Sequence, residues 1–61
     1  MEYFSAVYRV RGYYHISAPY VSEAKLLEAN RFRAHARIAT VKAPTESALV
    51  PLLSAVIRSC Q

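Results

Sequence analysis

The sequence contains few of the residues on which small folds often rely. Its 61 residues include one cysteine, one glycine and no aspartate or tryptophan. The single cysteine, Cys60, excludes a disulfide bond within the chain. Together with His15 and His35 it supplies fewer soft ligands than the four of a usual structural zinc site, so we expect no metal. A single domain over residues 1–61 must therefore be held together by packing or by a partner subunit.

The same absences argue against enzymatic chemistry. Without aspartate there is no Ser-His-Asp triad, and one glycine cannot form a glycine-rich phosphate loop. The glutamates, Glu2, Glu23, Glu28 and Glu46, are scattered without a pairing pattern. Cys60 lacks the electropositive setting of a reactive thiol, so we interpret it as inert. We therefore expect a non-enzymatic protein with no catalytic residues and no cofactor.

The charge and the hydrophobic pattern limit the kinds of partner and the cellular compartment that we expect for this chain. The chain carries eight lysines and arginines against four acidic residues, a formal net charge of +4. This excess points to an acidic partner: nucleic acid, an acidic protein surface or anionic lipid. The chain has no run of 18 apolar residues, so no membrane span is predicted. The N-terminal Met-Glu-Tyr-Phe-Ser does not have the pattern of a secretory signal. We expect a cytoplasmic protein that does not insert into a membrane.

The N-terminal segment has the two-residue alternation of β-strands. Residues 3–10 alternate between two faces and are rich in aromatic and β-branched side chains. Arg11-Gly12 then contains the glycine that a tight turn favours, and residues 13–18 alternate again. We predict a β-hairpin over residues 3–18 that ends at Pro19, with a single long bent strand as the alternative.

A helix and a third strand follow. Ser22 is a suitable N-cap, and residues 23–30 are almost all strong helix formers. Residues 31–36 are ambiguous, because their polarity alternates as in a strand whereas alanine and arginine favour a helix. Extended structure is expected again from Arg37 to Lys42.

The C-terminal segment gives the clearest periodic signal. Thr45 is a suitable N-cap, and apolar residues recur at helical spacing from Leu49 to Cys60. Pro51 lies inside this pattern and predicts a kink or a restart of the helix.

These elements predict an α+β fold, a small β-β-α-β-α domain. It would have a three-stranded antiparallel-type sheet with two helices on one face. The expected core is apolar and lies between this face and the helices. It comprises Phe4, Ala6, Tyr8, Val10, Tyr14, Ile16, Leu26, Leu27, Ile38, Leu49, Leu53, Val56 and Ile57. The opposite face of the sheet, including Val7, would then be uncovered.

We expect the uncovered face to bind a partner. Its candidate binding residues are cationic or aromatic: Arg9, Arg11, Tyr13, His15, Arg33 and Arg37, with His35 beside them. Arginine and tyrosine are frequent hot spots of protein interfaces. Aromatic rings among arginines also suit nucleic acid, where rings stack on bases and guanidinium groups hold phosphates. A solvated polar face without a partner is the third interpretation.

The C-terminal helix offers another interaction surface. Its apolar stripe is explained by core packing, but it is wide, and the surplus would form a symmetric homodimer interface. The residues of this interface would be Leu49, Leu52 and Val56.

Two segments carry a resemblance to a known family. Ala18-Pro-Tyr-Val-Ser-Glu-Ala-Lys-Leu-Leu27 and Ala36-Arg-Ile-Ala-Thr-Val41 resemble short prophage-encoded proteins of the host cell-division-inhibitor (Icd-like) group, over about half of the chain. The resemblance implies a phage or mobile-element accessory protein that binds and inhibits a host or competitor protein in the host cytoplasm. It implies no particular site residues. The leading prediction is therefore a small interaction protein with a protein partner, with nucleic-acid binding and a structural homodimer as alternatives.

Overall fold

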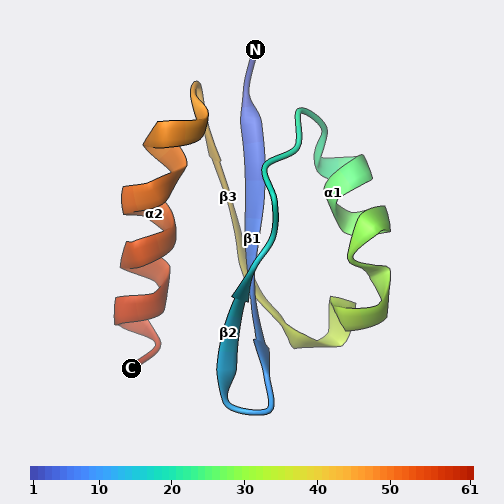
Figure 1. Cartoon of the computed structure of the whole chain (residues 1–61), viewed down its shortest axis with the longest axis vertical. Coiled ribbons are helices and arrows are strands. Elements are labelled where there is room, and N and C mark those ends of the chain that lie inside the picture. The colour runs from blue at the N-terminus through green and yellow to red at the C-terminus, as the bar shows by residue number, and fades with distance from the viewer.

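The first strand is the centre of the fold. The computed structural model covers residues 1–61, and β1 (Tyr3–Val10) pairs antiparallel with both β2 (Tyr13–Ile16) and β3 (Arg37–Ala43). The sheet order is β2-β1-β3 (Figure 1). Helix α1 (Glu23–Ala29) and a 3₁₀ helix, η1 (Arg31–Ala36), connect the two edge strands, and α2 (Glu46–Ser59) ends the chain. The predicted α+β domain with an antiparallel three-stranded sheet is confirmed.

The hairpin has a two-residue turn at the predicted position. Arg11 and Gly12 both have positive φ, +52° and +83°, and Val10 pairs with Tyr13 across them. Two successive positive φ values are typical of the type I′ turn, whose twist matches that of the flanking strands. The alternative of one bent strand is wrong.

We expect Gly12→Ala to destabilise the domain by about 1–2 kcal/mol, the cost of placing a Cβ in left-handed backbone. No heavy atom lies within 4 Å of the added Cβ, so the loss comes from the backbone alone. Urea denaturation followed by circular dichroism measures it. Arg11→Asn is the matched variant and should be neutral or stabilising, because asparagine suits the first central position of this turn. Equal stability of wild type and Gly12→Ala would contradict the turn geometry.

The second strand is shorter than predicted. β2 ends at Ile16, yet the chain stays beside β1, because the Ser17 N–H donates to the Ala6 carbonyl at 3.0 Å. Ser17 Oγ accepts from the Ala6 N–H at 3.0 Å, and Ser5 Oγ donates to the Ser17 carbonyl at 2.9 Å. These buried bonds replace the regular ladder just before Pro19, which has no N–H to donate.

The two helices lie on opposite faces of the sheet, so the predicted placement on one face is wrong. Figure 1 shows α2 on one side of the strands and α1 on the other. Val7 packs with Leu49 and Leu53 of α2, whereas Tyr8 packs with Leu26 of α1. Successive side chains of a strand point to opposite faces, and β1 is apolar on both. Each face therefore needs its own helical cover.

Both predicted N-caps are confirmed. Ser22 Oγ accepts from the Lys25 N–H at 3.5 Å, and Thr45 Oγ1 accepts from the Ala48 N–H at 3.2 Å. The ambiguous residues 31–36 are neither α-helix nor strand but the 3₁₀ segment η1, two short 3₁₀ turns that meet at Arg33, whose φ and ψ of −118° and 19° are not helical. The strand expected from Arg37 is confirmed as β3.

Helix α2 runs without a break across Pro51, so the restart offered as one of the two predictions does not occur. The ring lies on the exposed side of the helix, where water can satisfy the carbonyl left without its amide partner. No helix in the structure has both the length and the apolar character needed to cross a membrane.

The core is divided into two small clusters instead of the single one predicted. One comprises Val7, Ala43, Leu49 and Leu53, and the other comprises Ala6, Tyr8 and Leu26. Several residues expected in the core are instead exposed to a third or more: Val10, Ile16, Leu27 and Ile38. Of the three residues expected in a dimer interface, Leu49 is buried, Val56 packs against the same cluster and only Leu52 is exposed.

Candidate functional site: a basic and aromatic cleft

The predicted binding residues do not share one face, because the two-residue turn sets the pairing of the hairpin. Residues paired across antiparallel strands point to the same face. Arg9 pairs with Tyr14, and its guanidinium lies 5.7 Å from the centre of that ring, on the α2 side. Tyr13 pairs with Val10, and His15 pairs with Tyr8, on the α1 side. The uncovered sheet face that was expected to carry all of these residues does not exist.

The remaining arginines of the predicted set also separate. Arg11 occupies the exposed turn. Arg37 begins β3, and its Nη1 donates to Thr40 Oγ1 at 3.4 Å. Arg33 lies in η1 and is the one arginine that meets Tyr13 and His15 in a common cleft.

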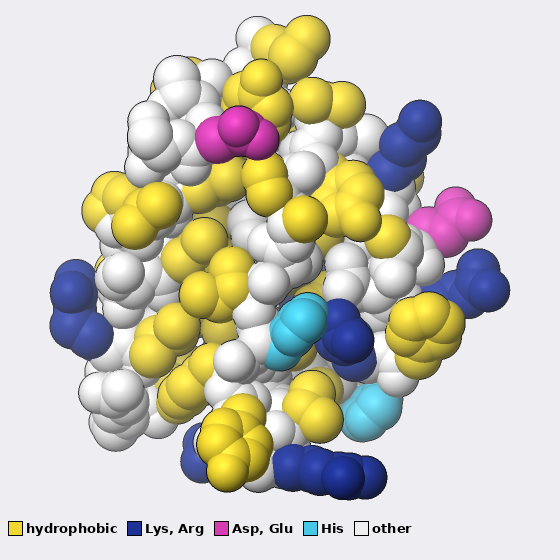
Figure 2. All heavy atoms as spheres, viewed as in Figure 1, with side chains coloured by type: hydrophobic (Ala, Val, Ile, Leu, Met, Phe, Trp, Pro, Cys, Tyr) yellow, Lys and Arg dark blue, Asp and Glu magenta, His cyan; other side chains and the backbone are white.

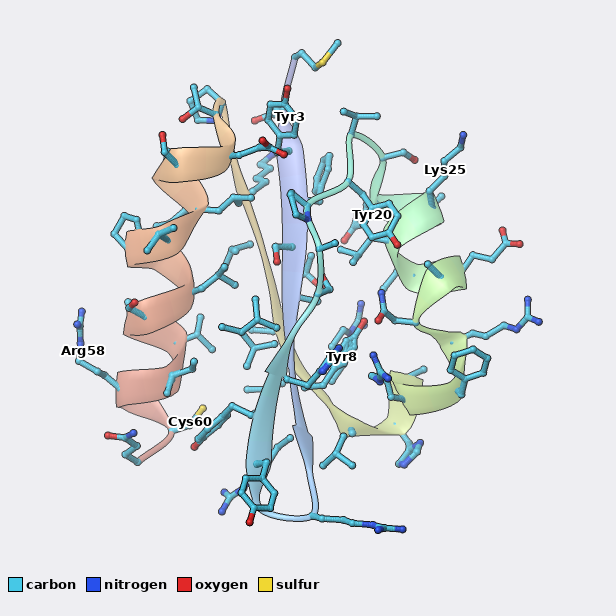
Figure 3. All side chains as sticks on the ribbon, viewed as in Figure 1. Tyr3, Tyr8, Tyr20, Lys25, Arg58 and Cys60 are labelled. Carbon is cyan, nitrogen blue, oxygen red and sulfur yellow. The ribbon has the colours of Figure 1, made fainter.

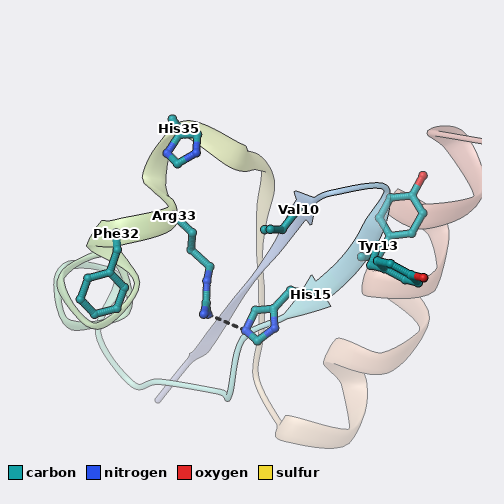
Figure 4. Close-up of a pocket in the computed structure, with 7 residues that line it drawn as sticks. Val10, Tyr13, His15, Phe32, Arg33 and His35 are labelled. Carbon is teal, nitrogen blue, oxygen red and sulfur yellow. Dashed lines mark hydrogen bonds between the residues drawn. The ribbon is translucent and has the colours of Figure 1, made fainter.

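The cleft lies between the hairpin and η1 and has a volume of about 430 Å³. Figure 4 shows its walls, with Tyr13 and His15 contributed by β2 and with Phe32, Arg33 and His35 contributed by η1. Three of the predicted site residues therefore come together here: Tyr13, His15 and Arg33. The structure adds Val10, Tyr14 and Phe32 to them and places His35 in the same cleft.

Arg33 and His15 meet at the centre of the cleft. Arg33 Nη1 donates to His15 Nε2 at 2.6 Å and to Asn30 Oδ1 at 3.1 Å (Figure 4). A guanidinium group has only donors, so in this contact Arg33 donates and His15 Nε2 accepts. The Tyr8 ring lies beneath both side chains, 6.0 Å from the Arg33 guanidinium and 6.3 Å from the His15 ring.

Two aromatic rings stand on opposite sides of this pair. Tyr13 of β2 is 79% exposed and Phe32 of η1 is 73% exposed. Exposed aromatic rings are costly in water and are typical of surfaces that bind a partner. The cleft therefore combines apolar rims with a cationic centre.

The arginines of this protein have no carboxylate partners. The one ion pair in the structure is exposed and joins Lys42 Nζ to Glu2 Oε1 at 3.9 Å. Five of the six arginines belong to the hairpin, η1 or the first residue of β3: Arg9, Arg11, Arg31, Arg33 and Arg37. In the view of Figure 2 the acidic side chains lie in the upper half of the molecule, away from the hairpin turn. The histidine side chains and several basic ones lie in the lower half, near the turn.

Other reactive groups lie outside the cleft. Cys60 is half-buried at the end of α2 (Figure 3) and is not among the residues that line the cleft. No group of three or more histidine, cysteine or acidic side chains is placed to hold a metal ion.

Sequence reasoning missed Val10, Tyr14, Asn30 and Phe32 as parts of the site. Phe32 lies in residues 31–36, whose sequence favours an α-helix or a strand and gives no signal of the 3₁₀ conformation found. Val10 was expected in the core. The pairing of Val10 with Tyr13 follows from a two-residue turn, so this part of the site was available from the Arg11-Gly12 signal.

Comparison with known proteins adds no family. No family model matches the chain, and no curated protein or solved structure matches it either.

Proposed function

We propose that this chain is a non-enzymatic interaction protein that binds an acidic protein surface through the cleft between the hairpin and η1. The observation that carries the proposal is the pair of exposed rings, Tyr13 and Phe32, on either side of Arg33. Aromatic and arginine side chains dominate the energetics of many protein interfaces. A partner that covers the rings would remove apolar surface from water and bring its own groups to Arg33.

The charges around the cleft support an acidic partner. The arginines near the hairpin are not neutralised within the chain, so their field extends into solvent. Such a field accelerates association with a negatively charged surface and disfavours basic ones.

The groups in the cleft support binding over catalysis. Its ionisable side chains are tyrosines, histidines and one arginine, with no carboxylate or thiol to serve as a partner base or nucleophile. The resemblance to the Icd-like group extends the proposal, with a host or competitor protein in a bacterial cytoplasm as the partner that is bound and inhibited.

The double variant Tyr13→Ala/Phe32→Ala tests the surface. We expect it to lose at least about a hundredfold in affinity, because truncation of two hot-spot residues commonly costs about 2 kcal/mol each. The measurement is capture from nuclease-treated bacterial lysate, identification by mass spectrometry, and calorimetry with the purified partner. The control is Val21→Ala/Val50→Ala, which removes two exposed apolar side chains elsewhere. Undiminished binding by the ring variant, or equal loss in the control, would overturn the proposal.

Nucleic acid is the second candidate, favoured by the same exposed rings among arginines. Salt separates the two candidates. Binding that neutralises phosphates weakens by about 0.9 log units per log unit of salt for each contact, whereas binding dominated by buried rings weakens far less. A signal that disappears after nuclease treatment and falls steeply with salt would replace the protein partner with nucleic acid.

A further inference from the structure

We propose that His15 and Arg33 form a binding site for an oxyanion, the carboxylate or phosphate group of a partner, and that His15 takes up a proton when the anion binds. This inference deepens the proposed function, on which it rests, by naming the chemical group that the cleft receives. It follows from the contact between Arg33 Nη1 and His15 Nε2, because both nitrogen atoms are donors when the imidazole is charged.

In the structure without a ligand, Arg33 and His15 contact each other directly. Arg33 Nη1 lies 2.6 Å from His15 Nε2, and this contact needs the lone pair of a neutral imidazole. Protonation of His15 removes that lone pair and places two cations against each other. An anion between them would accept a hydrogen bond from each, and such charge-assisted bonds are stronger than neutral ones.

Arg33 has donors to spare for a ligand. Its Nη1 is engaged by His15 and by Asn30 Oδ1, while no protein acceptor is found for Nη2 or Nε. Asn30 is itself buried, and its Nδ2 donates to the Leu26 carbonyl at 2.9 Å. The amide therefore fixes one edge of the guanidinium and leaves the other edge available, as paired recognition of a carboxylate or phosphate requires.

The side chains that face His15 come from β1, β2 and η1, and none of them is acidic. Tyr8 of β1 packs edge-on against its ring, and Arg33 of η1 bonds to it. Tyr13 from its own strand and His35 from η1 line the same cleft. None of these side chains is a carboxylate, so nothing in the chain itself competes for the site.

Proton uptake makes anion affinity depend on pH in a defined direction. Histidine changes charge between about pH 5 and 8. If His15 gains a proton on binding, the anion binds more tightly as the pH falls. Uptake of one proton per anion changes the affinity by up to about tenfold per pH unit, so we expect binding to be at least about tenfold tighter at pH 6 than at pH 8.

The test is nuclear magnetic resonance titration of the labelled full chain, following the His15 ring and the Arg33 Nε–H group. Sulfate, which keeps its charge over this pH range, represents a phosphate group, and acetate represents a carboxylate. Sodium chloride holds the ionic strength constant. We expect saturable shifts at His15 and Arg33, tighter at pH 6 than at pH 8. Tighter binding of sulfate would identify a phosphate-type ligand, and tighter binding of acetate a carboxylate; both support the site.

Matched variants isolate the two groups. His15→Gln keeps an acceptor for Arg33 but cannot gain charge, so it should bind weakly with no pH dependence. His35→Gln, a change to the other histidine of the cleft, should keep the dependence. Arg33→Lys should weaken binding at least about fivefold through loss of the planar fork. Arg58→Gln removes a charge from the outer side of α2 (Figure 3) and should change nothing.

The result that overturns the inference is an absence of saturable shifts at His15, or a pH dependence that survives in His15→Gln. These measurements need no partner, so they fail separately from the proposed function. If sulfate and acetate cause no shifts, the anion site is contradicted, but Tyr13 and Phe32 can still form the surface that binds the partner. If the partner binds equally well without both rings, the proposed binding surface is contradicted, whatever the result with sulfate and acetate.

Discussion

We expect Val7→Asp to unfold the domain and Val21→Asp to leave it folded. Val7 has no exposed surface and lies between β1 and α2, whereas Val21 is 57% exposed before α1. A buried carboxylate without a partner costs several kcal/mol, and a core of this size rarely supplies more than about 3–5 kcal/mol. Circular dichroism and an amide correlation spectrum distinguish the folded variant from the unfolded one.

This pair of variants tests the two-sided cover of the sheet directly. If both helices shared the α1 face, Val7 would be on an open surface and its aspartate would be solvated. A folded Val7→Asp protein would therefore contradict the packing of α2 against β1. Val7→Ala gives the same comparison in a milder form, with a measurable decrease in the free energy of unfolding of about 2 kcal/mol against nearly none for Val21→Ala.

Leu49→Ala should lower the free energy of unfolding by about 2–5 kcal/mol, and Leu52→Ala by less than about 1 kcal/mol. The two leucines are three positions apart on α2, but Leu49 is 3% exposed and Leu52 is 40% exposed. Leu49→Ala thus leaves a cavity in the core, whereas Leu52→Ala only removes exposed side-chain surface. Urea denaturation of both variants at equal protein concentration measures the difference.

The same two variants examine the homodimer alternative. A dimer formed through α2 would use Leu52 and Val50, its exposed apolar residues, while Leu49 is already buried within the chain. Sedimentation over a range of concentrations would then show dissociation in Leu52→Ala. Equal and concentration-dependent losses of stability in both variants would contradict the assignment of Leu49 to the monomer core.

The sequence was most informative where local chemistry decides structure. Ser22 and Thr45 cap their helices as expected, and Arg11-Gly12 makes the turn, because these residues act on their own backbone neighbourhood. The side of the sheet that each helix covers is not local. It depends on β1 being apolar on both faces. The alternation of Val7 and Tyr8 is the same whether one face of the sheet is covered or both are, so the sequence pattern did not distinguish the two cases.

The binding residues were predicted in type but not in arrangement. Tyr13, His15 and Arg33 do meet, whereas Arg9 lies on the other face. The alternation had been continued through the turn as though the chain were straight, but Val10 pairs with Tyr13, which reverses the assignment of every residue in β2. The position of Phe32 in the cleft depended on the 3₁₀ conformation of η1. Neither the helix propensity nor the alternating pattern of residues 31–36 favoured that conformation.

The two-sided burial of β1 has a consequence for the tolerance of this strand to sequence change. Four successive residues, Ser5 to Tyr8, are buried, although the strand is antiparallel. Antiparallel strands usually permit polar substitutions at every second position, where they face water. A saturation library of this chain would show an unbroken intolerant block at these four positions, followed within the same strand by the permissive residues Arg9 and Val10. Read without the structure, that profile would resemble the central strand of a parallel sheet in a much larger protein.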